Sequence, residues 1–143
     1  MMPKTKDDCI FCKIANGEIP SNSIYEDDNF NVILDLNPAN KGHALIIPKV
    51  HYQDVYSMDD AFASKVYPLA AKVARVLKGA MHADGINILQ NNEEPAGQTV
   101  FHFHVHVIPR YMDDDIDMTW TPLESNPDEQ EILAKELRAQ LMK

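Results

Sequence analysis

The stretch FHFHVHVIPR, residues 101–110, places three histidines at alternate positions with apolar residues between them. Side chains alternate between the two faces of a strand, so we expect His102, His104 and His106 to share one face and the intervening residues to face the core. Half of the chain's six histidines therefore lie within five residues. Packing gives no reason for such a cluster, because buried imidazole needs hydrogen-bond partners. The stretch predicts a functional site, either a metal site or a catalytic histidine assisted by its neighbours.

Gly97, Gln98 and Thr99 come directly before the histidines and predict an anion-binding turn. They offer backbone amide donors, an amide side chain and a hydroxyl, which can bind a phosphate without any net positive charge. A neutral imidazole that keeps its proton on one nitrogen can attack phosphorus with the other, and a neighbouring cationic imidazole can stabilise the developing charge. The loop and the histidines together therefore favour chemistry on a phosphate.

The overall composition limits the partners of this site. The 143-residue chain carries 13 Lys and Arg against 22 Asp and Glu, a formal net charge of −9. Proteins that bind nucleic acid normally present a basic face, so we expect no nucleic-acid partner. No apolar run approaches the roughly 20 residues of a membrane helix, and the charged segment Met1–Asp8 does not resemble a signal peptide. The sequence predicts one cytoplasmic domain with no membrane partner.

Hydrophobic periodicity predicts strands paired through short loops, with the helices placed separately. We expect strands at residues 30–36, 44–47, 85–90 and 100–108. We expect helices at residues 9–15, 57–79 and from 127 onward. Ser57 and Asp60 resemble a capping box for the long helix, Pro68 should kink or split it, and Asn126 can cap the last helix. The last helix has an apolar stripe made of Ile132, Leu133, Leu137 and Leu141. The fold class is α+β with an antiparallel sheet.

Cys9 and Cys12 form a CxxC pair whose spacing suits two thiolates on one zinc ion. Two histidines would have to complete a tetrahedral site, and the spacing does not select which two of the six. A redox pair and two buried free thiols are the alternatives. A redox CxxC is expected after a strand in a βαβ pattern, and this pair has no such setting. The pair therefore favours zinc.

The apolar and histidine positions of residues 102–108 match, at every position, the signature His-φ-His-φ-His-φ-φ of the histidine triad (HIT) family, in which φ is apolar. Residues 9–14, Asp35, residues 42–51 and residues 97–99 also match, so the chain most resembles the Hint-like nucleoside phosphoramidases. The resemblance implies a single HIT domain over residues 1–143, with a core of about residues 9–110 and a C-terminal helical tail at 111–143. It also implies a five-stranded antiparallel sheet per subunit, one long and one C-terminal helix, and a symmetric homodimer.

The resemblance implies a hydrolase that cleaves the bond from a purine nucleoside 5′-monophosphate to an amine. His104 would be the nucleophile and would form a covalent nucleotidyl-histidine, which water then hydrolyses. His106 would contact the phosphate and assist the leaving group, with His43 beside it. Asp35 would hold the ribose hydroxyls and Asn91 would lie near the phosphate. The implied catalytic set is His104, His106, His43 and Thr99, and the implied nucleotide-binding set is Asp35, Asn91, Gly97, Gln98, Thr99, His104 and His106.

The resemblance also assigns a metal site. Relatives that carry the CxxC pair hold a structural zinc, one per subunit, and the matching ligands here are Cys9, Cys12, His51 and His102. His102 would then be unavailable for proton transfer, and no metal would take part in the reaction. The branch that transfers nucleotides between sugar phosphates has glutamine at the third triad position, so His106 argues against that branch.

Three other functions remain open at this point. A dinucleoside polyphosphate hydrolase of the same family shares a Pro-Arg step like Pro109–Arg110. A metal-dependent hydrolase would use the three triad histidines as a catalytic ligand set. A nucleotide-binding module would bind a monophosphate tightly with little turnover.

Overall fold

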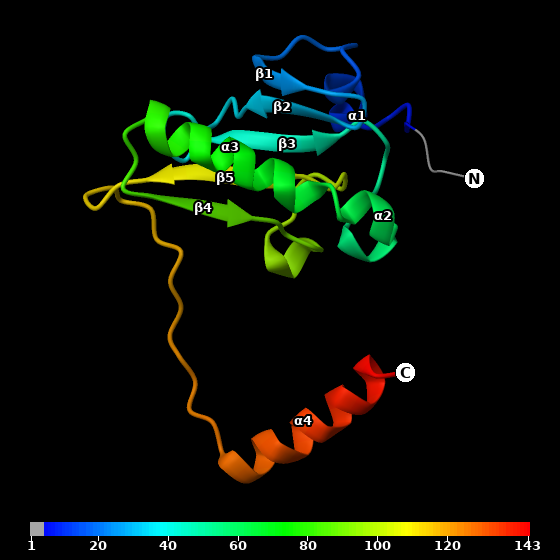
Figure 1. The fold of residues 1–143 in the computed structure, drawn as a ribbon, viewed down its shortest axis with the longest axis vertical. Coiled ribbons are helices and arrows are strands. Elements are labelled where there is room, and N and C mark those ends of the chain that lie inside the picture. The colour runs from blue at the N-terminus through cyan, green and yellow to red at the C-terminus, as the bar shows by residue number, and fades with distance from the viewer. Residues whose placement is uncertain (1–4) are drawn as a thin grey trace.

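The computed structural model describes residues 5–143, and the first four residues of the Met1–Asp8 segment lie outside the described residues. The helices and strands follow one another as Figure 1 shows. Their bounds are α1 Ile10–Ala15, β1 Ser23–Glu26, β2 Phe30–Leu34, β3 Ala44–Pro48, α2 Asp60–Ala63, α3 Val66–Ala80, β4 Gly85–Leu89, β5 Val105–Arg110 and α4 Pro127–Leu141. Two short 3₁₀ turns, η1 at Val55–Ser57 and η2 at Glu94–Ala96, lie in the connections.

The five strands form one antiparallel sheet in the order β1-β2-β3-β5-β4, which confirms the predicted fold class. β5 lies between β3 and β4, so His106 is paired with Leu45 on one side and Leu89 on the other. The residue pattern did not predict β1. Its four residues are mostly exposed and carry little of the alternation that marks a half-buried strand.

Helix α3 covers one face of the sheet and α1 lies against the other (Figure 1). The larger core packs Leu69 and Val73 of α3 against Phe103, Val105 and Val107. The smaller core holds Ala15 of α1 against side chains of the opposite face of the sheet, namely Ile33, Leu45 and Ile47. The apolar residues between the triad histidines therefore face the α3 core, as predicted.

Two sequence predictions about element bounds are wrong. The helix predicted over residues 57–79 is divided into η1, α2 and α3, and Pro68 lies in the first turn of α3, where no intrahelical N–H bond is required. Ser57 does not cap the long helix. It closes a capping box with Asp54 in η1, while the Asp59 carboxylate accepts the Phe62 N–H and caps α2.

The strand predicted over residues 100–108 begins later, at Val105. Residues 101–104 lead into β5 as irregular chain, held by a bond from the Phe103 N–H to the Tyr52 carbonyl (2.6 Å). His102 and His104 therefore lie before the strand, and only His106 is in the sheet ladder. This irregular entry lets His102 turn toward the N-terminal segment.

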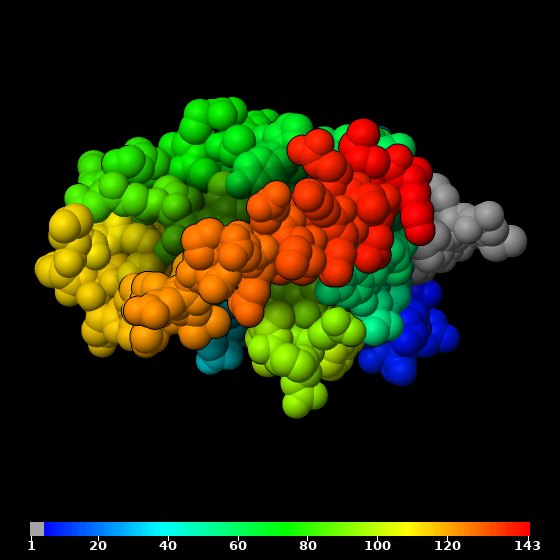
Figure 2. Space-filling view, turned by 90° about the horizontal axis from the view of Figure 1, so that it is seen from below, coloured from blue at the N-terminus to red at the C-terminus, as the bar shows by residue number. Residues whose placement is uncertain are grey.

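The C-terminal segment leaves the sheet after β5 and ends in α4, which lies apart from the sheet (Figure 1). Asn126 caps α4 as predicted, since its side chain accepts the N–H groups of Asp128 and Glu129 (3.0 and 3.1 Å). No residue of α4 is buried, so its predicted apolar stripe is exposed. Figure 2 shows this segment, orange to red, in front of the rest of the molecule. Among residues 5–143, no helix has the length and apolar character that crossing a membrane requires.

Candidate active site and metal cluster

His104 is held in one tautomer by the backbone. Its Nδ1 lies 2.7 Å from the His102 carbonyl oxygen, which can only accept, so Nδ1 carries the proton. The ring is 8% exposed, and burial lowers the pKa of His104 below its usual value, which favours the neutral form. The edge-on ring of Phe11 lies against it, with 4.9 Å between the ring centroids. The neutral ring therefore keeps an unprotonated Nε2, the atom that a nucleophile needs.

His43 and His106 lie side by side next to His104. His43 Nε2 is 2.9 Å from His106 Nδ1 and 3.6 Å from the Asp35 carboxylate. Burial, together with the neighbouring His104 and His43 rings, lowers the pKa of His106 to about 4. The structure thus brings together Asp35, His43, His104 and His106, which the sequence placed in two separate segments.

These histidines do not converge on one ion. Asp35, His43 and His106 offer ligand atoms within 4.8 Å of one another, but His43 Nε2 and His106 Nδ1 face each other at hydrogen-bond distance. This group contains only one of the three triad histidines, His106. His102, in turn, directs its Nδ1 toward the cysteines. The described residues therefore give no support to a catalytic metal held by the three triad histidines.

The loop before the triad is braced from within by Gln98. The Gln98 side chain is buried: its oxygen accepts the Glu93 N–H (2.7 Å), and its nitrogen donates to the carbonyls of Gln53 (2.7 Å) and Val100 (3.1 Å). The amide that the sequence offered to an anion is therefore committed to the loop.

Gly97, Thr99 and Asn91 lie at the outer side of this loop. Gly97 has φ of +101°, a left-handed conformation that favours glycine, and a Cβ there would lie 3.2 Å from the Asn91 side-chain nitrogen. That nitrogen donates a long bond to the Gly97 carbonyl (3.4 Å). Thr99 is exposed. The structure places Asn91 beside the loop, although six residues separate it from Gly97.

Cys9, Cys12, His51 and His102 form a second cluster, whose four ligand atoms lie within 4.8 Å of one another. His102 Nδ1 is 3.3 Å from Cys9 Sγ and 3.4 Å from Cys12 Sγ, and His51 Nδ1 is 3.4 Å from Cys12 Sγ. A tetrahedral zinc site with Zn–S near 2.3 Å and Zn–N near 2.05 Å has edges of roughly 3.4–3.8 Å. The donor set and its spacing therefore fit one zinc ion.

The surroundings of the cluster also suit a metal. His102 is fully buried and its Nε2 donates to the Pro48 carbonyl (2.9 Å), which leaves Nδ1 unprotonated and directed at the two sulfurs. Burial raises the pKa of the Cys12 thiol to about 11, so the thiolate needs a cation beside it. A carbonyl behind a metal-binding imidazole is the usual arrangement that orients such a ligand.

Sequence reasoning missed the backbone groups that orient these rings. The carbonyls of His102 and Pro48 and the Ala39 N–H, which lies 3.0 Å from His43 Nδ1, each set a histidine tautomer. Backbone groups leave no signature in residue types. The side-chain patterns, namely the triad, the CxxC pair and the Gly97–Thr99 loop, were what could be recognised in advance.

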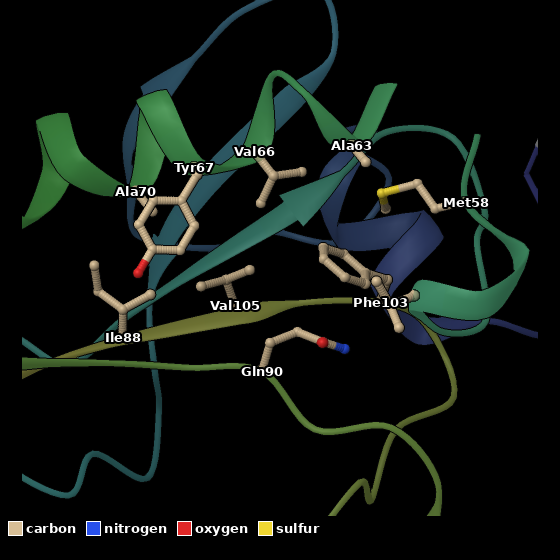
Figure 3. Close-up of a pocket in the computed structure, with 10 residues that line it drawn as sticks. Met58, Ala63, Val66, Tyr67, Ala70, Ile88, Gln90, Phe103 and Val105 are labelled. Atoms are coloured by element: carbon tan, nitrogen blue, oxygen red, sulfur yellow. The ribbon is translucent and has the colours of Figure 1, made fainter. Parts of the chain in front are cut away.

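An apolar pocket of about 270 Å³ lies on the other face of the sheet and is shown in Figure 3. Tyr67 of α3, Ile88 of β4 and Phe103 and Val105 line it, and Gln90 is its main polar side chain. Phe103 and Val105 belong to the core face, opposite the histidines. This pocket is therefore separate from the histidine site and lacks the polar groups that a phosphate requires.

Comparison with known proteins gives consistent matches over most of the chain. Residues 16–113 match the HIT domain model. The chain is similar to the adenosine 5′-monophosphoramidase HNT1 of Saccharomyces cerevisiae, with 40% identity over 134 residues, 93% of this chain and 82% of the yeast protein. Among solved structures it is similar to SMU.412c from Streptococcus mutans UA159 (41% identity, TM-score 0.93, 99% of this chain and 90% of that one). It is also similar to a Zn-bound histidine triad family protein from Mycobacterium smegmatis (38% identity, TM-score 0.73, 94% and 95%).

Proposed function

Because this chain belongs to the histidine triad family, we propose that it is a hydrolase that releases a purine nucleoside 5′-monophosphate from an amine-linked precursor, a phosphoramidate. The yeast relative is named for this activity. The observation that carries the proposal is the His104 ring, buried and fixed with its proton on Nδ1 and its Nε2 unprotonated, next to His106. A neutral, oriented imidazole of this kind is suited to attack on phosphorus.

The reaction has two steps. His104 Nε2 forms a bond to phosphorus, the phosphorus–nitrogen bond breaks, and the leaving nitrogen takes up a proton from solvent and departs as the amine. Because His104 keeps its Nδ1 proton, the nucleotidyl-histidine is cationic at the ring and is a good leaving group. Water then attacks phosphorus, returns a proton to solvent and releases the monophosphate and neutral His104. His106 stabilises the phosphate oxygens and the leaving nitrogen by hydrogen bonding.

The nucleotide is bound by groups around this ring. The Asp35 carboxylate accepts hydrogen bonds from the ribose hydroxyls. The backbone of Gly97 and the side chains of Thr99 and Asn91 contact the phosphate. Gln98 supports them by holding the loop. These groups grip ribose and phosphate, so the proposal leaves the choice of purine base open.

The test is release of the monophosphate from adenosine 5′-phosphoramidate by the native protein and by His104→Ala. We expect the variant to lose at least a thousandfold in kcat, because the covalent step has no nucleophile. The matched control is His82→Asn, which replaces an exposed histidine outside the site with a residue that tolerates its positive φ of 53°. Full turnover by His104→Ala would refute the proposal. An inactive native protein that binds the monophosphate tightly would instead favour a binding module.

A substrate panel separates this activity from dinucleoside polyphosphate hydrolysis. Arg110, which carries the resemblance to that branch, is held by Asp114 (2.8 and 2.9 Å), Asn87 (2.7 Å) and the Ile116 carbonyl (2.8 Å). An arginine engaged in this way has few donors left for a polyphosphate. We therefore expect the phosphoramidate to be the better substrate by kcat/KM.

We further propose that Cys9, Cys12, His51 and His102 hold one structural zinc per subunit. The zinc ion would supply the positive charge that keeps the two cysteines as thiolates. It would tie the N-terminal segment to the triad through His102 and take no part in the reaction. Metal analysis of the purified protein should give one zinc per chain, and Cys12→Ser should abolish it.

The two free cysteines fit a reducing compartment, so we propose the cytoplasm.

A second copy of the chain is the proposed partner. Strand β4 is at the edge of the sheet and all its residues are half-buried, next to the apolar pocket of Figure 3. Helix α3 carries three cations and no acid, while residues 111–143 contain nine acidic and three basic residues. The exposed apolar stripe of α4 and its acidic tether therefore complement the α3 and β4 side of another copy in both polarity and charge. Light scattering should give a dimer mass, and deletion of residues 124–143 should weaken the dimer.

A further inference from the structure

The loop from Leu36 to Gly42 lies between β2 and β3, and one of its backbone amides contacts the ring of His43. The Ala39 N–H lies 3.0 Å from His43 Nδ1. A backbone N–H can only donate, so His43 Nδ1 has to be the acceptor and carries no proton. The protonated, cationic form of His43 is excluded by the same contact, because it would bring two N–H groups face to face. Neutral His43 therefore carries its proton on Nε2.

This tautomer is passed to the next ring. His43 Nε2–H points at His106 Nδ1, 2.9 Å away, so His106 Nδ1 is the acceptor. Neutral His106 then carries its proton on Nε2, which is the nitrogen free of His43. A single backbone amide thus determines which atom His106 presents to a bound phosphate. If the Ala39 N–H moved away, both rings could exchange tautomers.

One side chain anchors this loop to the rest of the protein. Asn40 Nδ2 donates to the Pro109 carbonyl of β5 (2.8 Å) and to the Asp114 carboxylate (3.0 Å). The His43 N–H donates to the Asn40 carbonyl (3.0 Å), so Asn40 is also joined to the histidine through the backbone. Asn40 is therefore fixed by its side chain to the end of β5 and by its backbone carbonyl to His43, the residue whose ring accepts the Ala39 N–H.

Asp114 is a rigid anchor for Asn40. Its side chain is 7% exposed and accepts two bonds from Arg110 (2.8 and 2.9 Å) and one from the Tyr111 N–H (2.8 Å). The guanidinium of Arg110 holds the pKa of Asp114 far below its usual range, so the carboxylate stays charged. Asn40 thus joins the loop to a fixed charged pair at the end of β5.

We propose that Asn40 is a positioning residue for catalysis: anchored to Pro109 and Asp114, it keeps the Ala39 amide on His43 and so fixes His106 as a hydrogen-bond donor through Nε2. The inference rests on the proposed role of His106 in the hydrolysis. The β2–β3 ladder continues to the pair of Leu34 and Ala44 without Asn40, so the sheet itself does not depend on this side chain.

The experiment combines nitrogen NMR of the histidine rings with kinetics on adenosine 5′-phosphoramidate. Ring nitrogens with and without a proton resonate in separate regions, so the spectrum reports each tautomer directly. Asn40→Ala removes both side-chain bonds. Asn40→Asp keeps the shape but puts an oxygen against two oxygens, at Pro109 and Asp114. The control is Asn22→Ala, which removes an exposed asparagine side chain outside this loop.

We expect single tautomers at His43 and His106 in the native protein and in Asn22→Ala, and mixed tautomers in Asn40→Ala. We expect kcat to fall about five- to tenfold in Asn40→Ala and further in Asn40→Asp, with KM changed less than about twofold, as suits loss of one or two hydrogen bonds remote from the nucleotide. The circular dichroism spectrum should stay native.

Unchanged tautomers in a folded Asn40→Ala protein would overturn the inference, and so would mixed tautomers with native kcat. A protein that lost its native spectrum on both substitutions would also overturn it, because Asn40 would then serve folding. Native protein with single tautomers but no turnover would refute the proposed function alone. The spectroscopic result is therefore independent of whether the hydrolysis is assigned correctly.

Discussion

Replacement of Gln98 by alanine should destabilise the protein by about 3 kcal/mol and impair nucleotide binding. The Gln98 side chain is 2% exposed and makes three hydrogen bonds, to Glu93, Gln53 and Val100. Truncation leaves three backbone groups without partners, and each buried unsatisfied group costs about 1–3 kcal/mol. Because Gln53 and Glu93 are exposed residues that water can reach, we take the lower value for each bond.

The assay is thermal unfolding of Gln98→Ala, with Gln130→Ala in exposed α4 as the matched control. For a chain of this size about 3 kcal/mol corresponds to a Tm lower by roughly 9–15 °C. Gln98→Glu should show a loss of similar size, because it keeps the acceptor for the Glu93 N–H but places an oxygen against two carbonyls. A Tm within about 2 °C of native for Gln98→Ala would refute the reasoning, since it would mean that the loop does not depend on these bonds.

The function of the loop should change in parallel. Gly97 and Thr99 flank Gln98, so loss of its bonds moves both groups that are proposed to contact the phosphate. We expect KM for adenosine 5′-phosphoramidate to rise several-fold at temperatures where Gln98→Ala is still folded. The comparison with Gln130→Ala separates this effect from a general loss of stability.

Three further predictions concern the loop at Gly97, the half-buried His106 and the metal cluster. Gly97→Ala should cost about 1–2 kcal/mol in a urea titration, because alanine is strained at φ of +101° and its Cβ meets Asn91 at 3.2 Å. Between pH 6.5 and about 4, the unfolded chain binds a proton at His106 that the folded protein excludes, so stability should be retained above pH 6.5 and fall by about 1.4 kcal/mol per pH unit below it. Urea titrations at several pH values should show that the unfolding free energy of His106→Gln falls less per pH unit than that of the native protein. Removal of zinc with a strong chelator should lower the Tm of the native protein but not that of Cys12→Ser, and an equal change in both would contradict the proposed metal site.

The alternation of the triad was sufficient to predict which side chains face the core. Phe103, Val105 and Val107 all lie in the α3 core, although residues 101–104 are not in the strand. Alternation therefore persists in extended chain that has no ladder partner. The residue at which β5 begins could not be predicted, because it depends on pairing with β3. That pairing begins where Val105 lies opposite Ile46.

The metal cluster could be predicted only in part from the residues. The CxxC spacing indicated two thiol ligands, but the choice of His51 and His102 came from the family resemblance. The structure explains that choice, because Pro48 ends β3 and its carbonyl orients His102, while His51 follows three residues later. Such a relation joins residues 54 positions apart, and no local pattern contains it.

Three identical side chains at alternate positions acquire different chemistry because a different neighbouring group binds the second nitrogen of each ring. His102 donates from Nε2 to a carbonyl of β3, so its Nδ1 is left for the metal cluster. His104 donates from Nδ1 to the carbonyl two residues before it, so its Nε2 is left for attack. His106 accepts at Nδ1 from His43, so its Nε2 is left as a donor. Spacing alone therefore cannot define the site: a chain with the same three histidines but without the Pro48 carbonyl or the loop that orients His43 would present three interchangeable rings.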